Sequence, residues 1–299
     1  MTAVFKPGAT ALITGGASGV GYAMARICRK HGMNLALVDI NADNLKKAHS
    51  QLSSEAKQNE KTETYAIDVS QQSDWHKLQS DVASKFGDVD LLMLNAGTSV
   101  KPSTGNPWTD PDYHAKTYGT NVFGVINGIA SFLPSLQKKE SPSTIVITGS
   151  KQGITNPPGS NPAYNASKAT IKHLAEHLSH DMRNQSPQIS VHLLIPGWTY
   201  TSFSGNSGPV SDEEAGAKKP AGAWFASQCA QYGFDKIGQG KFYIVCPDND
   251  VTEELDAARM TWAVGDVVEG RSPLSRWDPK YKDEAAEWIK KDAERRAKN

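Results

Sequence analysis

A tyrosine and a lysine stand four residues apart in the stretch Tyr164-Asn165-Ala166-Ser167-Lys168. On a helix, this spacing places both side chains on one face. An ammonium group beside a phenol favours the phenolate and lowers a pKa that is ordinarily about 10. The pair therefore predicts a general acid/base that works at neutral pH. Because Tyr-x-x-x-Lys is common, a buried tyrosine and a solvated lysine are the alternative interpretation.

Two more polar groups are expected to face this pair. Ser150 follows a β-branched strand at residues 145–147, whose end can hold the hydroxyl opposite the phenol. Gln152 comes two residues later and is expected to add a polar contact to a substrate. Asn121 is a polar exception in an apolar helix expected at residues 117–137. It is interpreted either as an amide bonded to neighbouring backbone or as a kink that holds a water molecule.

A glycine-rich turn opens the chain. Residues 15–21 read Gly-Gly-Ala-Ser-Gly-Val-Gly, directly after a short apolar strand at residues 11–14 and before a helical apolar pattern. A strand, a glycine turn and a helix bring backbone N–H groups and a helix N-terminus to a pyrophosphate. A Cβ at Gly15, Gly19 or Gly21 would obstruct the turn or the ligand. The pattern predicts a nucleotide site, with an ordinary glycine turn as the alternative.

An acidic residue at the end of the next strand indicates which nucleotide is bound. Asp39 lies 20 residues after Gly19, where a carboxylate accepts hydrogen bonds from the adenosine ribose. A carboxylate there also repels a 2′-phosphate, and neither Ser18 nor Ile40 supplies the cation that a 2′-phosphate requires. NAD is therefore expected in preference to NADP. The alternative for Asp39 alone is a helix N-cap.

Other strand ends carry polar or small residues at the same edge of the expected sheet. Asp68 ends a strand at residues 64–69, where it can meet the adenine edge. Asn95-Ala96-Gly97 follows a continuous apolar strand at residues 89–94, and its small side chains let backbone approach a ligand. The last strands are expected at residues 189–195 and 241–246.

This alternation of strands and helices, with a glycine turn after the first strand, predicts the α/β class and a doubly wound parallel sheet of seven strands. Helices are expected at residues 41–55, 71–86, 117–137, 163–183, 223–234, 253–262 and 282–298. Residues 1–246 are predicted to form the catalytic domain, and residues 247–299 its C-terminal helical extension. Residues 202–222, rich in Gly, Ser, Pro and charge, are expected to form a mobile flap over a site.

Composition limits the function further. Lys+Arg and Asp+Glu both number 32 in 299 residues, which argues against nucleic acid or an anionic membrane as the main partner. Three cysteines without paired spacing fit a reducing compartment, and no secretory signal or membrane-length apolar run is seen, so a cytoplasmic location is expected. His173, His177 and His180 share a helix face, but no carboxylate or cysteine pattern completes a metal site. No metal is expected, and a polar or subunit-contact stripe is the preferred interpretation.

Taken in order, these motifs resemble the short-chain dehydrogenase/reductase family of Rossmann-fold enzymes, in its shorter-subunit branch, over roughly residues 8–246. The motifs that carry the resemblance are residues 14–21, Asp68-Val69, Asn95-Ala96-Gly97, Asn121, Ser150, Tyr164 with Lys168, and Pro196-Gly197.

The resemblance implies a role for each matching residue. Tyr164 is the expected general acid/base, Lys168 holds the nicotinamide ribose and lowers the tyrosine pKa, Ser150 orients the substrate oxygen, and Asn121 anchors a relay water. The residues expected to contact the cofactor are Gly15, Ser18, Gly19, Val20, Gly21, Asp39, Ile40, Asp68, Val69, Asn95, Ala96, Gly97, Tyr164, Lys168, Pro196, Gly197, Thr199 and Thr201.

The expected activity is NAD-dependent interconversion of a secondary alcohol and a ketone. Trp198, Phe203, Trp224 and Phe225 favour an apolar or aromatic small molecule, although several of them can equally be core residues. The pocket is expected between Trp198, the flap at residues 202–222 and the loop with Trp108, with Ser150, Gln152 and Tyr164 contacting the substrate.

Three alternatives remain open: a redox-neutral lyase or epimerase with tightly bound NAD, an NADP-dependent carbonyl reductase, and a non-catalytic nucleotide sensor or scaffold. The intact set of Ser150, Tyr164 and Lys168 argues against the sensor. The apolar helix at residues 117–137 favours a homodimer or homotetramer.

Overall fold

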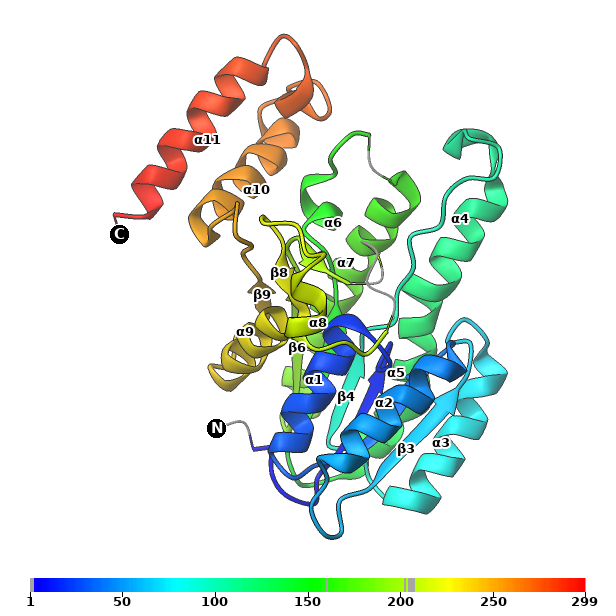
Figure 1. Ribbon diagram of the computed structural model, residues 1–299. Helices are drawn as coiled ribbons and strands as arrows, with labels where there is room; N and C mark the ends of the chain where they lie inside the picture. Colours follow the sequence, from blue (N-terminus) through cyan, green and yellow to red (C-terminus); the bar gives the residue numbers. More distant parts are fainter. Residues whose placement is uncertain (1–2, 160, 202, 204–207, 299) are drawn as a thin grey trace.

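The computed structural model describes residues 3–159, 161–201, 203 and 208–298. Its centre is a parallel seven-stranded sheet (Figure 1). The strands, in their order across the sheet, are β3 (Thr62–Ala66), β2 (Asn34–Asp39), β1 (Thr10–Thr14), β4 (Leu91–Leu94), β5 (Ser143–Thr148), β6 (Ile189–Ile195) and β9 (Tyr243–Val245). The order reverses between β1 and β4, and the crevice at the carboxyl ends of the strands at such a reversal is where open α/β sheets bind ligands. The predicted α/β fold with a doubly wound, parallel, seven-stranded sheet is confirmed.

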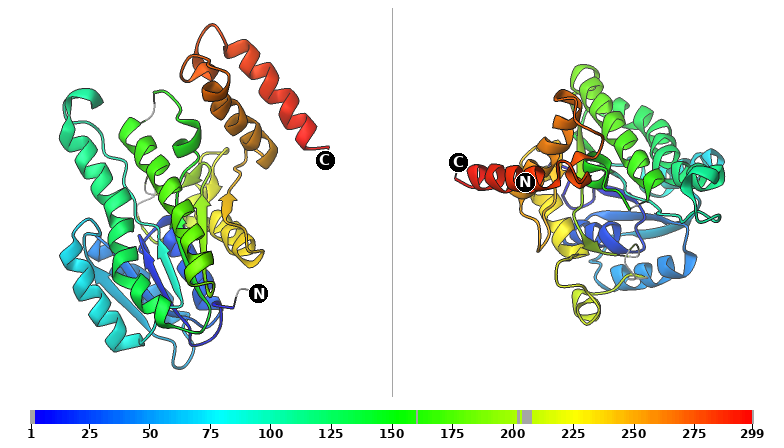
Figure 2. Two further views of the ribbon diagram at one scale, coloured as in Figure 1. Left: turned by 180° about the vertical axis from the view of Figure 1, so that it is seen from behind. Right: turned by 90° about the horizontal axis from the view of Figure 1, so that it is seen from above.

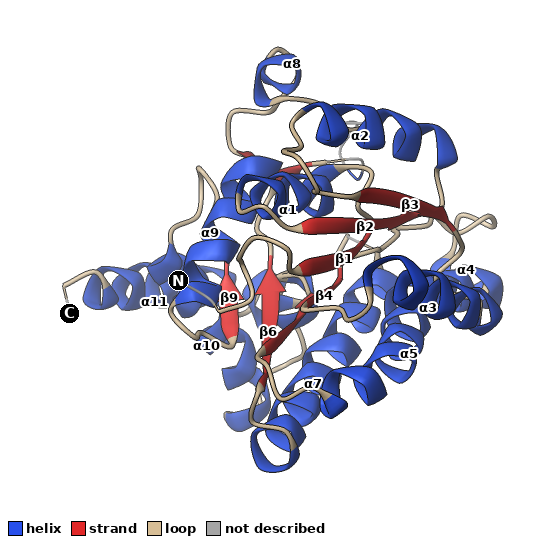
Figure 3. Cartoon of the chain, turned by 90° about the horizontal axis from the view of Figure 1, so that it is seen from below, coloured by secondary structure: helices blue, strands red, loops and turns tan. Residues whose placement is uncertain are grey.

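Helices cover both faces of the sheet (Figure 3). One face packs against α1 (Gly19–Lys30), α2 (Ala42–Ser54) and α9 (Ala226–Gly238). The other packs against α3 (Gln72–Phe86), α5 (Gly124–Lys138) and α7 (Pro162–Gln185). The central strands β1 and β4 are buried along their whole length, which is why their sequences are continuously apolar rather than alternating.

The C-terminal extension is a helical hairpin that projects from one side of the sheet domain (Figures 1 and 2). It consists of α10 (Glu253–Val268), the 3-10 turn η4 (Ser275–Trp277) and α11 (Lys282–Arg296). Ala258, Trp262, Ala285 and Ile289 form a small core of its own between the two helices. The Trp262 indole Nε1 donates to Ser275 Oγ at 2.8 Å, which ties the connecting turn to α10.

The long apolar helix expected at residues 117–137 is the clearest difference from the predicted elements. The structure has α4 (Pro111–Tyr118), a π-helical turn η2 (Gly119–Phe123) and then α5. A π turn inserts one residue into the helical ladder and is often associated with functional sites. Periodicity alone misses it because the extra residue shifts the pattern by less than one turn.

The segments that connect the last strands also differ from expectation. A short helix that was not among the expected helices, α6 (Gln152–Thr155), follows Ser150 and Lys151. The start of the helix expected at residues 223–234 is a short strand, β8 (Trp224–Phe225), which pairs with β7 (Thr199–Tyr200). Part of the expected flap forms α8 (Asp212–Gly216), and positions 202 and 204–207 of that flap lie outside the described residues. The described part of the chain has no helix with the length and apolarity to span a membrane.

Candidate active site

The glycine turn between β1 and α1 has the conformation that its sequence requires. Gly15 and Gly19 have φ angles of +64° and +53°, in the left-handed region that favours glycine. A Cβ at Gly21 would lie 2.3 Å from Gly15 O, and one at Gly15 would lie 2.9 Å from Asn95 Nδ2. Ser18 is the extended N-cap residue of α1, and Val20 is buried in its first turn. The turn thus presents backbone N–H groups at a helix N-terminus, with no room for side chains behind them.

Asp39 braces this turn. One oxygen of its carboxylate, Oδ2, accepts from Ala17 N at 3.2 Å, and the other, Oδ1, accepts from Asn41 N at 3.0 Å. The N-cap of α2 is Asn41, whose side chain accepts from Asn44 N, so the interpretation of Asp39 as a helix cap is wrong. The next residue, Ile40, is 73% exposed and supplies no positive charge beside the carboxylate.

The ends of β1, β4 and β5 are joined around Asn95. Thr14 Oγ1 accepts from Asn95 N at 2.9 Å and from Ala96 N at 3.0 Å. The Asn95 side chain donates to Thr14 O at 3.2 Å and accepts from Thr148 Oγ1 at 3.1 Å. These contacts fix the backbone that leads to Gly97, where an added Cβ would lie 3.6 Å from Lys168 Nζ.

Asp68 and Val69 follow β3 rather than forming its last two residues, as the sequence pattern had placed them. The Asp68 carboxylate Oδ1 accepts from Ser70 N at 2.9 Å, and Val69 is buried with its carbonyl bonded to Trp75 Nε1. The two residues therefore form a fixed turn beside the sheet edge.

The start of α7 carries the tyrosine and the lysine. Asn161 is the N-cap, and its Oδ1 accepts from Tyr164 N at 2.9 Å. The Tyr164 hydroxyl bonds to the Ser150 side chain, so the hydroxyl and phenol expected to face each other are in contact. Lys168 is buried, and its Nζ donates to Thr148 O at 2.8 Å and lies 5.8 Å from the centre of the Tyr164 ring.

The ionisation of this pair differs from the sequence-based expectation. Burial raises the pKa of Tyr164 above its usual value, while the hydrogen bond from Ser150 opposes this shift. Burial also lowers the pKa of Lys168 to about 8. The expected lowering of the phenol pKa by the ammonium is therefore not what this arrangement gives, because desolvation acts against the charged form of both groups.

Asn121 lies in the π turn, fully buried. Its Oδ1 accepts from Thr98 N at 2.8 Å, and its Nδ2 donates to Thr98 O at 3.0 Å and to Ser167 Oγ at 3.0 Å. The interpretation of Asn121 as an amide bonded to backbone agrees with these contacts, and the residue lies in a π-helical turn. The kink and the water expected there stay predictions.

Comparisons with known proteins agree with this geometry. The profile of the family described as short chain dehydrogenase matches residues 9–211. The chain is 31% identical over 222 residues to the (S)-acetoin-forming diacetyl reductase of Staphylococcus aureus, a match that covers 74% of this chain and 83% of that protein. The family match covers more than half of the chain and includes the glycine turn, Ser150, Tyr164 and Lys168.

This chain belongs to the short-chain dehydrogenase family. It is an oxidoreductase of that family that uses a nicotinamide cofactor. A crystal structure of a short chain dehydrogenase/reductase from Burkholderia phymatum in complex with NAD is similar, with a TM-score of 0.76, 27% identity, and coverage of 90% of this chain and 97% of that one. The apo form of LigO from Sphingobium sp. strain SYK-6 has a TM-score of 0.70 and 24% identity, which shows the fold alone. That likeness covers 98% of this chain and 99% of LigO, and so includes the C-terminal extension.

One aromatic residue of this short-chain dehydrogenase, Phe203, lies beside the tyrosine. The Phe203 ring is 5.9 Å from the Tyr164 ring, and a Cβ at Gly97 would lie 3.7 Å from Phe203 Cζ. Trp198 is 48% exposed. Trp108, by contrast, is 78% exposed and packs on His114 at 6.3 Å. Phe203 therefore covers Tyr164 directly, whereas Trp108 lies on an outer turn, η1 (Pro107–Thr109).

The segment after β6 returns to the glycine turn. Thr199 Oγ1 donates to Gly197 O at 3.2 Å, and a Cβ at Gly19 would lie 3.1 Å from Thr201 Cγ2.

Gln152 N donates to Ser150 Oγ at 3.2 Å, so Gln152 orients the serine through its backbone.

Several residues that build the site were missed in the sequence. The end of β1 is held by Thr14 and the end of β5 by Thr148. The start of α7 is held by Asn161, and the loop after Ser150 by Lys151. Only Asn161 carried a readable signal, since an asparagine before proline and a helical pattern is a typical N-cap. The other three act through contacts that are distant in the sequence.

Proposed function

We propose that the chain is an NAD-dependent dehydrogenase that interconverts a secondary alcohol and a ketone on an apolar or aromatic small molecule. The observation that carries the proposal is the contact between Ser150 and Tyr164, with Lys168 buried beside the phenol. A hydroxyl and a phenol that meet in a partly buried site form a pair that can bind an alcohol oxygen and exchange its proton.

The residues at the sheet edge fit a dinucleotide. The cradle made by Gly15 and Gly21 would be filled by a single Cβ, which supports a pyrophosphate held by backbone. Asp39 would receive the ribose hydroxyls, and the absence of a positive charge at exposed Ile40 favours NAD over NADP. When bound, the nicotinamide accepts a hydride from the alcohol carbon or returns it to the ketone.

The side chains would divide the remaining work. Ser150 orients the substrate oxygen, and Tyr164 removes its proton during oxidation or supplies it during reduction. Lys168 holds the nicotinamide ribose and, with a pKa of about 8, can exchange a proton near neutral pH. Asn121 fixes the backbone of Thr98 at both its N–H and its carbonyl, and so supports a relay water beside Lys168.

The test is a direct assay for reduced cofactor with NAD, and separately with NADP, across secondary alcohols that include 1-aryl alcohols. Formation of NADH with one subclass of alcohol supports the reaction, the cofactor preference and the substrate class together. Turnover only with NADP contradicts the inference from Asp39. NAD that copurifies and yields no net NADH with any alcohol contradicts the redox reaction and moves the assignment to redox-neutral chemistry.

A further inference from the structure

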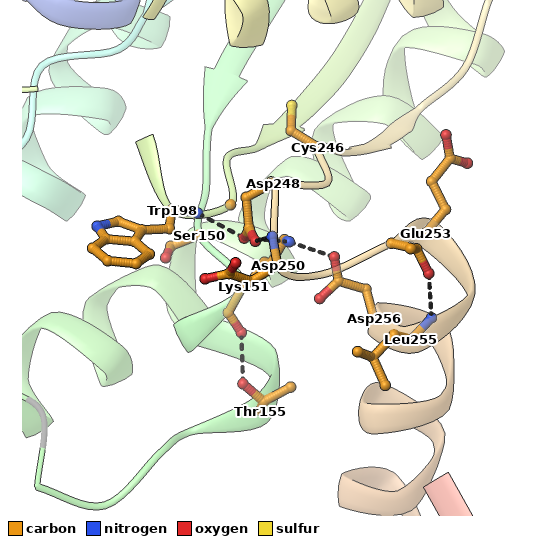
Figure 4. A network of polar contacts seen from close by, with 12 residues as sticks. Ser150, Lys151, Thr155, Trp198, Cys246, Asp248, Asp250, Glu253, Leu255 and Asp256 are labelled. Carbon is orange, nitrogen blue, oxygen red and sulfur yellow. Dashed lines mark hydrogen bonds and ion pairs between the residues drawn. The ribbon is translucent and has the colours of Figure 1, made fainter. Parts of the chain in front are cut away.

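The residue after Ser150 is a lysine whose charge is held inside the protein. The Lys151 side chain is 14% exposed, and its Nζ forms ion pairs with Asp248 Oδ2 at 3.4 Å and with Asp256 (Figure 4). Its backbone is fixed as well, because Lys151 O accepts from Thr155 Oγ1 at 3.1 Å at the start of α6. Both the backbone and the ammonium group of Lys151 are therefore held, and any movement of the ammonium group breaks its ion pairs.

The oxygen of Asp248 that pairs with Lys151 also binds the backbone of the segment after β6. Asp248 Oδ2 accepts from Trp198 N at 3.0 Å, immediately after Gly197. A Cβ at Gly197 would lie 2.7 Å from Lys151 Nζ and 2.8 Å from Asp248 Oδ2, so this backbone is packed directly on the ion pair. The loop after β5, with Ser150, and the segment after β6, with Trp198, are thus joined through one oxygen atom.

The third member of the cluster comes from the C-terminal extension. Asp256 is in α10, and its side chain is 5% exposed. Burial and the charge of Asp248 raise the pKa of Asp256, while Lys151 and Arg259 oppose this. Two carboxylates from different segments therefore converge on one ammonium, and loss of either one removes a contact that holds the largely buried Lys151 in place.

From these contacts we propose that Lys151 is a positioning residue, through which Asp256 of the extension sets the placement of Ser150 and Trp198. The extension is then part of the substrate site although it contributes no residue that touches the reacting atoms. This inference rests on the proposed function for its consequence in turnover. The claim that Asp256 holds the loop with Ser150 and the segment with Trp198 in place does not depend on the proposed function.

The test compares two alanine variants on one helix. Asp256→Ala removes the contact and leaves Lys151 paired with Asp248, so the remaining pair is neutral. Glu254→Ala, two residues earlier in α10, is the matched control because it removes a carboxylate that is not in the cluster. Asp256→Glu serves as the conservative variant. Hydrogen exchange is followed in peptides that cover residues 148–157, 196–201 and 10–22.

Exchange at residues 148–157 and 196–201 is expected to be at least about tenfold faster in Asp256→Ala, with residues 10–22 unchanged. The kcat/KM for the alcohol, counted per NAD-binding site, should fall at least about tenfold. Glu254→Ala should match the wild type in both measurements, and Asp256→Glu should recover part of the loss.

Unchanged exchange in the two loops overturns the proposal. So does faster exchange at all three peptides, because that result indicates general destabilisation. Faster loop exchange with an unchanged kcat/KM shows that the cluster does not set Ser150, and this too overturns it. If no alcohol is turned over by the wild type, the proposed function fails, and the exchange data alone decide whether Asp256 holds the loops.

Discussion

Tyr164 and Lys168 lie where burial works against the charged form of each. The pKa of the phenol is raised above its usual value and that of the ammonium is lowered to about 8, so the two values move apart. Burial therefore favours the neutral phenol and the neutral amine over the phenolate and ammonium pair.

Replacing Tyr164 by phenylalanine tests the proton step alone. The ring and its packing on Phe203 remain, while the hydroxyl bonded to Ser150 is lost. We expect kcat to fall by at least about 10²-fold, which is the contribution typical of a positioned acid/base. Calorimetry should show an NAD affinity close to that of the wild type. Full turnover by Tyr164→Phe would remove Tyr164 from the mechanism.

Lys168 should leave a signature in the pH dependence of stability. Its folded-state pKa of about 8 lies below the ordinary 10.5, so between these values the unfolded chain binds more protons than the folded one. The free energy of unfolding contributed by this group therefore rises with pH from about 8 to 10.5, by up to about 3 kcal/mol. Below pH 8 the cost of burying the ammonium is present in full.

Lys168→Met removes this contribution. The difference in unfolding free energy, methionine variant minus wild type, should be largest below pH 8 and should decrease steadily towards pH 10.5. Denaturant unfolding of both proteins across this range measures it, and taking the difference cancels effects of pH on the rest of the chain. Parallel curves for the two proteins would show that burial does not shift the lysine pKa.

The residues expected to act in catalysis or cofactor binding could be predicted from the sequence, whereas the residues that hold them in place could not. Tyr164, Lys168 and Gly19 act through spacing or conformation that is local to one turn, and local spacing is written in the sequence. Thr14 and Asn95 are 81 positions apart, and nothing near either one indicates that they meet. The shifted phenol pKa escaped prediction for the same reason, since desolvation depends on burial in the folded protein.

At the scale of elements, the start of α7 depends on one asparagine. Asn161 Oδ1 accepts from Tyr164 N and also from the Tyr113 hydroxyl of α4, and Asn161 Nδ2 donates to Val100 O at 2.5 Å. The cap therefore fixes the helix that carries Tyr164 against α4 and against the loop after Gly97. It is both a helix end and a junction of three segments.

Asn161→Ala should lower the free energy of unfolding by about 1–2 kcal/mol, as the loss of an N-cap does, and should also lower kcat because Tyr164 is no longer held in register. Asn41→Ala is the matched control, since it removes the N-cap of α2 far along the chain from Tyr164. The control should lose similar stability and keep its kcat. Equal kcat values for the two variants would show that the cap has no part in placing Tyr164.

Element boundaries were predicted where one physical signal dominated. The ends of α2 and α3 agree with the expected helices within one residue, because capping residues and apolar periodicity indicate the same limits there. The π turn at Asn121 and the short pair of β7 and β8 were not predicted. Both depend on contacts with other segments, such as the bonds from Asn121 to Thr98, rather than on their own propensities.

At the scale of the whole molecule, the doubly wound parallel sheet could be predicted because parallel strands joined by helices have few right-handed arrangements. The place of the extension could not be predicted, because α10 reaches the site through Asp256, a single aspartate in a helix with other acidic residues.

The apolar surface of η2 and α5 is partly exposed in the single chain. The sequence indicated a helix that is apolar on nearly all sides, yet Phe123 is 54% exposed and Ile126 is 38% exposed in the single chain.

We expect these two side chains to be covered by a second copy of the chain, in a homodimer or homotetramer. They are three residues apart on the η2–α5 surface, so they share a face, and isologous contact would pair this face with itself. Phe123→Glu with Ile126→Glu places like charges at the centre of that contact. Sedimentation velocity should show the wild type as an oligomer and the double variant as a smaller species, because the added charges disrupt the contact between subunits.

Val267→Glu with Val268→Glu is the matched control, because these residues are 87% and 74% exposed on α10 and receive the same added charge. If the control dissociates and the α5 variant does not, the contact runs through the extension, and the apolar surface of α5 has another cause. A wild type that sediments as a monomer contradicts the assembly itself. Retained NAD binding by each variant would show that the fold is intact, so that a change in sedimentation reports the interface.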